Sequence, residues 1–309
     1  MDETEFLSIE NHGAIGAKNL FGTLGPAVKD AVLPGYHALS TAPFARQHPG
    51  ILYQMEETDL LTAELSARLW RRYNGPIRLL TDPMGYAYVK STALADAYDE
   101  ILPILDPRCC GIDPNKYWAA GKIAALSKLP APCVILDMDM MIWKPLALSG
   151  EKLVCACVEF IDEAVYPPFS YFRTAPGYAF PPEWSEEATA LNTAFLYIND
   201  EELKRVYTRE AFRFMLAERE SPDYWAICMT FAEQRVLGLC AEARGVYAKL
   251  LWDMDKESLT HIWGAKGKIK LEEAYRTFYL ETCKEKLLSL NPNTDKTGGE
   301  LKVESGELR

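Results

Sequence analysis

The chain has 309 residues and carries 33 Lys and Arg against 44 Asp and Glu, so its formal net charge is -11 at pH 7. With 49% hydrophobic residues, it is long enough to bury a sizeable core in one large or two small domains. The acidic excess excludes a generic basic nucleic-acid binder and argues against an anionic membrane surface as a partner, because both need clustered Lys and Arg.

The first half of the chain alternates apolar, strand-like runs with segments of helical period. Leu61, Leu65 and Leu69 share one face of a helix, which the segment 74–76 ends. The expected strands span 36–40, 77–80, 99–105 and 133–136. The expected helices span 57–73, 87–97 and 113–128, the last one opened by Asp113-Pro114, and 81–85 is expected to be a loop. This alternation predicts an α/β fold with a mostly parallel sheet.

The second half is less regular. Residues 164–184 are rich in Pro and aromatic residues and are expected to form a long ordered loop over a site. The aromatic side chains of this loop either pack the loop itself or form a wall that stacks on a sugar: Tyr166, Tyr171, Phe172, Tyr178, Phe180 and Trp184. Further elements are a strand at 193–198 and helices at 201–219 and 222–239. The expected domain organisation is an extension at 1–34 packed on a single domain at 35–290, with a flexible polar tail at 291–309.

The lack of recognisable targeting signals and the cysteine usage predict a cytoplasmic protein. The acidic N-terminus lacks the features of a signal peptide, and no run of ~18 apolar residues predicts a transmembrane segment. Of the eight cysteines, Cys133, Cys155 and Cys157 lie in apolar, strand-like runs, which favours buried, reduced thiols. The absence of a Cys-x-x-Cys pair argues against a structural zinc site.

The most informative segment is CVILDMDMMIWKPL at 133–146, where an apolar strand is followed by Asp137 and Asp139. In an extended segment, residues i and i+2 point the same way, so the two carboxylates are expected on one side, ~7 Å apart. The C-terminal edge of a parallel sheet is where open α/β folds bind ligands. The pair suits a hard divalent ion such as Mg²⁺ or Mn²⁺, and the alternative is two solvated aspartates in a turn.

Three later segments accompany this motif: LNTAFLYIN at 191–199, FAEQRVL at 231–237 and HIWG at 261–264. With the Asp-x-Asp strand, they resemble the nucleotide-sugar glycosyltransferases of the GT-A fold. The His-x-x-Gly segment is similar to the late motif of family 8 (glycogenin-like) retaining enzymes. TDPMG at 81–85 and NKYWAAGKIAAL at 115–126, taken with the strand, resemble a bacterial group of largely uncharacterised glycosyltransferase-like proteins. The resemblance spans 35–270 and implies a Rossmann-like mixed sheet, mostly parallel and flanked by helices.

The resemblance implies a metal site. Asp139 and His261 would be metal ligands, and Asp137 would bind the metal or the ribose of the donor. An imidazole together with two carboxylates favours Mn²⁺ over Mg²⁺. The alternative for His261 is a packed or surface histidine beside Trp263.

The resemblance also implies contacts to the donor phosphates. The backbone of Gly264 would approach a phosphate oxygen. The family places a Lys three residues after this Gly and then Pro-Trp, whereas this chain has Gly267 there and lacks Pro-Trp. Lys266 or Lys268 would therefore neutralise the leaving diphosphate, and Lys122 would face the donor. For all three lysines, a solvated surface position is the alternative.

Three polar residues are candidates for the reacting centre. Asn192 would contact the donor sugar or the acceptor, and Glu233 and Gln234 would contact the sugar hydroxyls or the reacting face. Thr81 and Asp82 would hold the base or the ribose. The alternatives are a turn at the start of a strand for Asn192, an exposed helical pair for Glu233 and Gln234, and a plain turn for Thr81 and Asp82.

The implied function is a metal-dependent glycosyltransferase of the hexosyltransferase type. It would move a sugar from a nucleoside-diphosphate donor, most plainly a UDP-sugar, to a hydroxyl of a glycan or another acceptor. The His-x-x-Gly resemblance favours retention of configuration, and the lack of an evident nucleophile fits a front-face displacement. The alternatives are a non-catalytic nucleotide-sugar or glycan-binding protein on the same fold, a haloacid-dehalogenase-type phosphatase with Asp137 as nucleophile, and a plain structural α/β scaffold.

Overall fold

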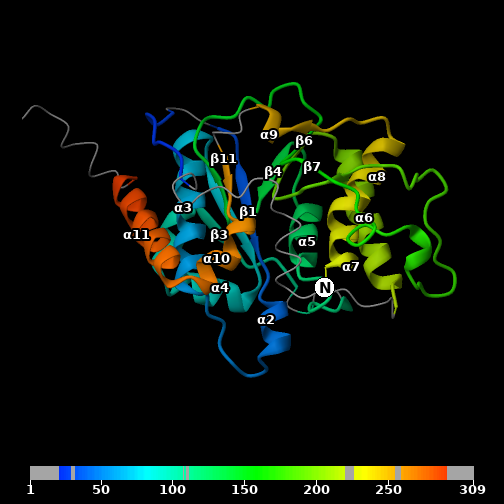
Figure 1. Cartoon of the computed structure of the whole chain (residues 1–309), viewed down its shortest axis with the longest axis horizontal. Helices are drawn as coiled ribbons and strands as arrows, with labels where there is room; N and C mark the ends of the chain where they lie inside the picture. The colour runs from blue at the N-terminus through cyan, green and yellow to red at the C-terminus, as the bar shows by residue number, and fades with distance from the viewer. Residues whose placement is uncertain are drawn as a thin grey trace, which may run out of the picture.

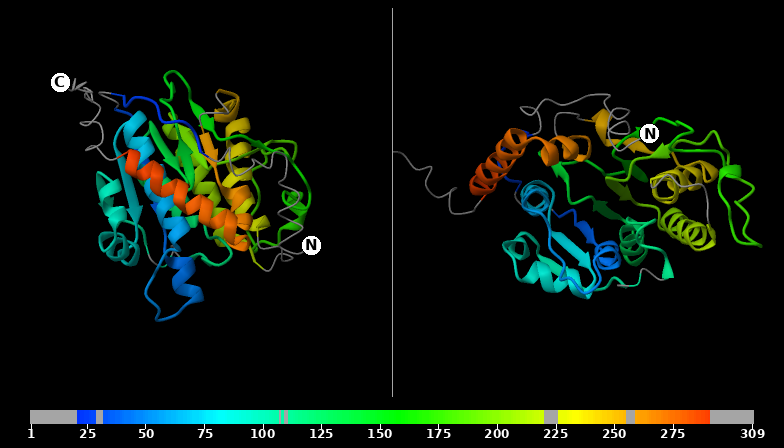
Figure 2. Two further views of the ribbon diagram at one scale, coloured as in Figure 1. Left: turned by 60° about the vertical axis from the view of Figure 1, so that its left-hand side comes forward. Right: turned by 60° about the horizontal axis from the view of Figure 1, so that its bottom comes forward.

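A computed structural model describes residues 21–28, 32–106, 108, 111–219, 226–254 and 259–290. Its centre is a seven-stranded sheet of order β10-β6-β9-β4-β1-β2-β3 with helices on both faces (Figures 1 and 2). The strands of this sheet are β1 Gly35–Leu39, β2 Ile77–Thr81, β3 Glu100–Leu102, β4 Cys133–Leu136, β6 Leu153–Cys155, β9 Phe195–Ile198 and β10 Lys249–Leu250. Two small sheets pair β5 Met140–Ile142 with β11 Leu259–His261 and β7 Val158–Glu159 with β8 Ala190–Leu191.

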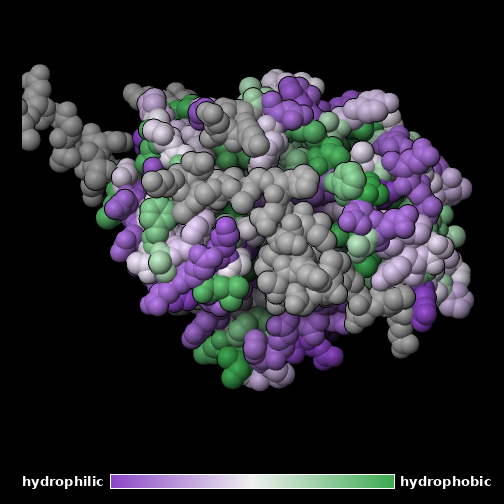
Figure 3. All heavy atoms as spheres, in the orientation of Figure 1, coloured by the Kyte–Doolittle hydropathy of each residue, from purple (hydrophilic) through white to green (hydrophobic). Residues whose placement is uncertain are grey.

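The α-helices separate β1, β2, β3 and β4 from one another along the chain, and within the described residues none lies between β4 and β9. The α-helices are α2 Ala42–Gln47, α3 Glu57–Tyr73, α4 Pro83–Lys90, α5 Ala120–Lys128, α6 Glu201–Ala217, α7 Ile227–Thr230, α8 Val236–Ala243, α9 Leu251–Met254, α10 Lys266–Leu271 and α11 Glu273–Ser289. No helix in the described residues is long and apolar enough to cross a membrane. On the face shown in Figure 3, hydrophilic residues are interspersed with apolar ones.

The sheet is mixed and mostly parallel, as the sequence predicts. β1 runs parallel to β2 and β4, β2 runs parallel to β3, and β6 runs parallel to β10. β9 is antiparallel to both of its neighbours, β4 and β6. Because β1 and β4 are parallel neighbours, they end at the same edge of the sheet.

Alternate residues of the strands enter two different cores. On β4, Cys133 and Ile135 pack with α5 and α6, whereas Val134 and Leu136 pack with α3 and α4. All four β4 residues are at most 1% exposed, which explains why the strand is a continuous apolar run instead of an alternating one. α11 packs on the outer side of α3 and extends this second layer (Figure 2).

The predicted helix at 57–73 coincides with α3, but the helix expected at 113–128 begins only at Ala120. Asp113 instead opens a turn, in which its carboxylate accepts a bond from the Asn115 N–H and its carbonyl accepts one from the Tyr117 N–H. An Asp-Pro pair supplies the same local bonds in a turn as at a helix start.

The segment 81–85 was expected to be a loop, and the structure corrects this. α4 starts at Pro83, and the Asp82 carboxylate caps it by accepting a bond from the Gly85 N–H. The helix expected at 87–97 is therefore two elements, α4 and a short 3₁₀ helix at Ala93–Ala97. Asp82 and Pro83 are an N-cap followed by a first helical position, which a turn prediction overlooks.

In the second half, β9 and α6 lie within the predicted strand and helix. The helix expected at 222–239 falls partly outside the described residues; its described part runs as α7, a π-helical turn at Phe231–Arg235 and α8. The loop at 164–184 packs through its aromatic rings: Phe172 and Phe180 contact Phe214 and Phe231.

Of the predicted extension at 1–34, the described part contacts the main body: Phe21 packs on Tyr279, and Gly25 bonds to Tyr73. Cys133 and Cys155 are buried and Cys157 is half-buried, and none of the described cysteines forms a disulfide with another. Cys109 and Cys110, the tail at 291–309 and most of the predicted extension lie outside the described residues.

Candidate metal centre

The turn after β4 places the two carboxylates of the Asp-x-Asp motif. β4 ends at Leu136, and the Met140 N–H donates to the carbonyl of Asp137 over 3.0 Å, which closes a turn between β4 and β5. The expected extended geometry of 137–139 is therefore wrong, because these residues form a turn. The turn still brings the carboxylates of Asp137 and Asp139 to one side.

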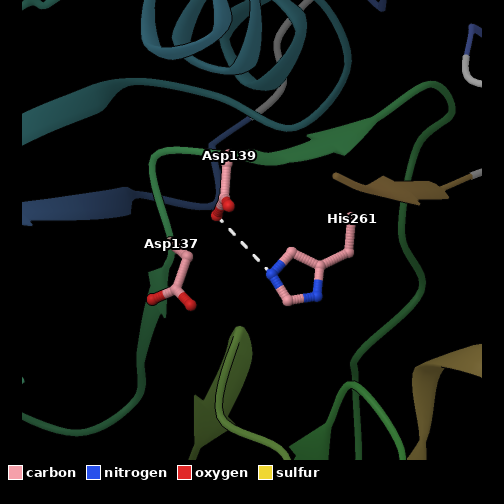
Figure 4. A group of neighbouring side chains, drawn as sticks. All are labelled: Asp137, Asp139 and His261. Atoms are coloured by element: carbon pink, nitrogen blue, oxygen red, sulfur yellow. Dashed lines mark ion pairs between the residues drawn. The ribbon is translucent and has the colours of Figure 1, made fainter. Parts of the chain in front are cut away.

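His261 reaches the same place from the far end of the chain. β11 pairs antiparallel with β5, and His261 stands opposite Met140, the residue that follows Asp139. Nε2 of His261 lies 3.6 Å from Oδ1 of Asp139. Figure 4 shows the side chains of Asp137, Asp139 and His261 directed toward a common space from the end of β4, the turn and β11.

Asp137, Asp139 and His261 together form what we call the metal-capable group, and their ligand atoms suit a divalent metal ion. One ligand atom each from Asp137, Asp139 and His261 lies within 4.8 Å of the other two. Two carboxylate oxygens and one imidazole nitrogen are ligands that Mn²⁺ and related ions accept, and three protein ligands leave positions open for phosphate oxygens or water.

Neighbouring charges shift the pKa values of Asp139 and His261. Burial disfavours the carboxylate of Asp139, yet the neighbouring His261 and Lys266 outweigh burial and hold the pKa of Asp139 well below its usual range. Burial also disfavours the imidazolium of His261, but the carboxylate of Asp139 raises the His261 pKa above its ordinary value. A bound cation would replace these positive charges as the partner of Asp139.

Lys266 stands beside this group at the start of α10. Its Nζ lies 2.8 Å from Oδ2 of Asp139, and this contact outweighs burial, so that its pKa is raised. Lys268 is exposed two positions further along the same helix. Gly264 has a backbone conformation open to any residue, and a Cβ there would meet no atom within 4 Å, so the space beside its backbone is free for a ligand.

Lys122 lies on α5 on the other side of Asp137. Its Nζ is 2.6 Å from Oδ1 of Asp137, contacts the carboxylate of Glu233 and donates to the carbonyl of Thr193. Burial opposes the charge of Lys122, but the two carboxylates outweigh it and raise the Lys122 pKa. The lysine thus bridges, half-buried, the metal-capable group and the π-helical turn.

Asn192, Glu233 and Gln234 each make side-chain hydrogen bonds within the protein. The Asn192 side-chain oxygen accepts from the Ala194 N–H, and its amide donates to Glu159. The Thr193 hydroxyl donates to the carboxylate of Glu233 over 2.7 Å. The side-chain oxygen of Gln234 accepts from the hydroxyl of Tyr166.

Thr81 and Asp82 are not part of this group. Both side chains are 0% exposed. The Thr81 hydroxyl donates to the carbonyl of Leu39, and the Asp82 carboxylate accepts from both the N–H and the hydroxyl of Thr41. With these bonds made, the two residues tie β2 and α4 to the end of β1.

Sequence reasoning missed Glu159 and the role of Thr193. Thr193 follows Asn192 within a segment that the motifs single out, so its position was a usable signal. Glu159 had none, because it meets Asn192 only through the pairing of β7 with β8.

Neither a protein-family model nor a curated protein sequence matches the chain. Solved structures that resemble it include a PaToxG glycosyltransferase, at 9% identity and a TM-score of 0.38 over 92% of this chain and 91% of that one. The galactosyltransferase LgtC, in complex with donor and acceptor sugar analogs, has 12% identity and a TM-score of 0.41 over 84% of this chain and 96% of LgtC. Mouse xyloside xylosyltransferase 1 has 10% identity and a TM-score of 0.37 over 74% of this chain and 96% of its own.

Proposed function

We propose that the chain is a metal-dependent glycosyltransferase that moves a sugar from a nucleoside-diphosphate donor, a UDP-sugar, to a hydroxyl of a glycan or another acceptor. The observation that carries this proposal is the convergence of Asp137, Asp139 and His261 at the C-terminal edge of the sheet, with Lys266 in contact with Asp139. A divalent ion held by two carboxylates and an imidazole, with a lysine beside it, suits a diphosphate better than a neutral ligand.

The residues of the chain would divide the work as follows. Asp137, Asp139 and His261 would hold Mn²⁺, or Mg²⁺ in its place, which when bound supplies Lewis-acid stabilisation of the diphosphate leaving group. Lys266 would leave Asp139 for a phosphate oxygen, and the free space beside Gly264 would admit the phosphate to its backbone. This choice of Lys266 over Lys268 rests on the contact to Asp139.

We also propose that the transfer retains the configuration of the anomeric carbon. The carboxylate of Glu233 is bound by Lys122 and Thr193 and is 8% exposed, so it is poorly placed as a free nucleophile. This supports a front-face displacement, in which the acceptor hydroxyl attacks the anomeric carbon while its proton passes to the leaving phosphate oxygen. The described cysteines form no disulfide with one another, which supports a cytoplasmic setting for the reaction.

The test is a panel of UDP-sugars with Mn²⁺, followed by sugar transfer and donor hydrolysis. Asp139→Asn is expected to abolish turnover and the rise in melting temperature that UDP and Mn²⁺ cause together. The matched control is Asp96→Asn, an exposed aspartate of the 3₁₀ helix at Ala93–Ala97, which should behave as wild type.

Each alternative has a distinct outcome. Binding of UDP-sugar without any turnover across the panel would indicate a non-catalytic binding protein. Hydrolysis of p-nitrophenyl phosphate with Mg²⁺, lost on substitution of Asp137, would indicate a phosphatase instead.

A further inference from the structure

Three buried polar side chains form a hydrogen-bonded chain that leads to β5, the strand that follows Asp139. None of the three belongs to a sequence motif described above. The hydrogen-bonded chain joins Tyr98, which precedes β3, to His37 of β1 and Ser66 of α3. It ends at the backbone carbonyl of Met140 in β5. His37 is 0% exposed, Ser66 1% and Tyr98 6%.

The direction of the hydrogen bonds in this chain follows from the donors available. The Ser66 hydroxyl has one proton, which it donates to the Met140 carbonyl over 2.5 Å, since a carbonyl can only accept. Its oxygen therefore accepts from Nε2–H of His37 over 3.2 Å. Nδ1 of His37 is then the acceptor, and the Tyr98 hydroxyl donates to it over 2.8 Å. The network thus assigns the Nε2–H tautomer to a neutral His37.

The backbone of Met140 connects the three residues of the metal-capable group. Met140 follows Asp139 directly, stands opposite His261 in the β5–β11 pairing, and closes the turn by donating its N–H to Asp137. β5 pairs only with β11 within the described residues, so its other edge faces α3. On that edge, the Ser66 hydroxyl is the partner that satisfies the buried carbonyl of Met140.

We propose that Tyr98, His37 and Ser66 are positioning residues that fix the β5 backbone, and through it the relative placement of Asp137, Asp139 and His261 as metal ligands. This inference rests on the proposed function in so far as those three residues hold a metal. Groups that orient metal ligands without touching the metal typically change metal affinity ten- to a hundredfold when they are removed.

The experiment measures Mn²⁺ binding by the loss of the free-ion signal in electron paramagnetic resonance, with no nucleotide present. Ser66→Ala is expected to weaken Mn²⁺ binding about tenfold. Its matched control is Thr62→Val, which removes a buried hydroxyl one turn earlier on α3 that bonds to Thr58 and Tyr279 and not to β5. Thr62→Val is expected to lower the melting temperature while leaving Mn²⁺ affinity unchanged.

Two further measurements test the same positioning role if Ser66→Ala folds poorly. Tyr98→Phe removes the far end of the chain and is expected to weaken Mn²⁺ binding less than Ser66→Ala. ¹⁵N NMR of the labelled protein should show His37 protonated at Nε2 and not at Nδ1.

The outcomes separate this inference from the proposed function. If wild type binds Mn²⁺ and Ser66→Ala binds it equally well, or if Thr62→Val weakens binding as much, the positioning role is wrong and the metal site stands. An Nδ1–H tautomer of His37 would also overturn it. If wild type binds no Mn²⁺, the proposed metal site is wrong, and this inference is wrong with it.

Discussion

Nζ of Lys122 lies 2.6 Å from Oδ1 of Asp137, and the same ammonium contacts the carboxylate of Glu233. The side chain of Lys122 is 13% exposed, and this one half-buried cation neutralises two carboxylates that come from the end of β4 and from the π-helical turn. Lys122 therefore links the metal-capable group to the segment that carries Glu233 and Gln234.

Removing the cation should destabilise the fold. Lys122→Met leaves the carboxylates of Asp137 and Glu233 close together without a partner, and we expect the free energy of unfolding to fall by about 3 kcal/mol. Adding Glu233→Gln should restore part of this loss, because one of the uncompensated charges is then gone. Urea unfolding of the single and double variants measures both effects. Lys128→Met, on the exposed last turn of α5, is the control and should stay within about 0.5 kcal/mol of wild type.

The two candidate lysines of α10 should differ in their effect on the donor. Lys266→Met is expected to weaken UDP binding in the presence of Mn²⁺ roughly 10- to 100-fold, the range for losing a hydrogen bond to a charged group. Mn²⁺ affinity without nucleotide should not fall, because Lys266 then no longer competes for Asp139. Calorimetric titration of Lys266→Met and Lys268→Met measures this. Equal losses in the two variants would contradict the assignment of Lys266.

Substitution of Gly264 should impair donor binding without affecting folding. A Cβ at this position meets no atom within 4 Å, so Gly264→Ala should change the free energy of unfolding by no more than about 0.5 kcal/mol. The added methyl group would occupy the space proposed for the phosphate, and the KM for the donor should rise about tenfold, a loss of ~1.4 kcal/mol. Gly121→Ala is the contrasting variant, because its Cβ would lie 2.4 Å from Cβ of Ser40 and should disturb the packing of α5. Unchanged donor kinetics in Gly264→Ala would count against the phosphate contact.

The pH dependence of stability should report on His37. Burial lowers the His37 pKa to about 3, against a partial opposing effect of Asp139. The folded state then stays unprotonated where the unfolded chain takes up a proton, so this stability is complete above the unfolded pKa of about 6.5 and is lost as the pH falls toward the folded pKa.

Comparison with a variant isolates this effect from other titrating groups. Between pH 7.5 and 5.0, wild type should lose about 2 kcal/mol more unfolding free energy than His37→Gln does. Urea unfolding at the two pH values measures the difference. Parallel losses in both proteins would show that His37 is protonated in the folded state.

The sequence predicted those elements whose signal is local. The helix at 57–73 repeats an apolar face along its own length, and the structure confirms it as α3. The starts of α4 and α5 were misplaced, because Asp-Pro provides the same backbone bonds in a turn and in a helix cap. Local pattern does not distinguish these two outcomes, and packing of the following residues decides between them.

The candidate site was predictable in part. A fully apolar β4 followed by Asp137 and Asp139 indicated carboxylates at the ligand-binding edge of a sheet, but the turn that Met140 closes was not visible in the motif. The roles of Thr81 and Asp82 in ligand binding stay predictions that their complete burial does not favour.

By itself, the sequence determined the alternation of strands and helices and the position of two aspartates at the end of a buried strand, because periodicity and strand ends are properties of short segments. Only the tertiary structure decided that His261 stands opposite Met140, that Lys122 bridges Asp137 and Glu233, and that Ser66 meets β5. Such contacts join residues far apart in the chain. Their geometry depends on strand order and helix packing, which no single segment encodes.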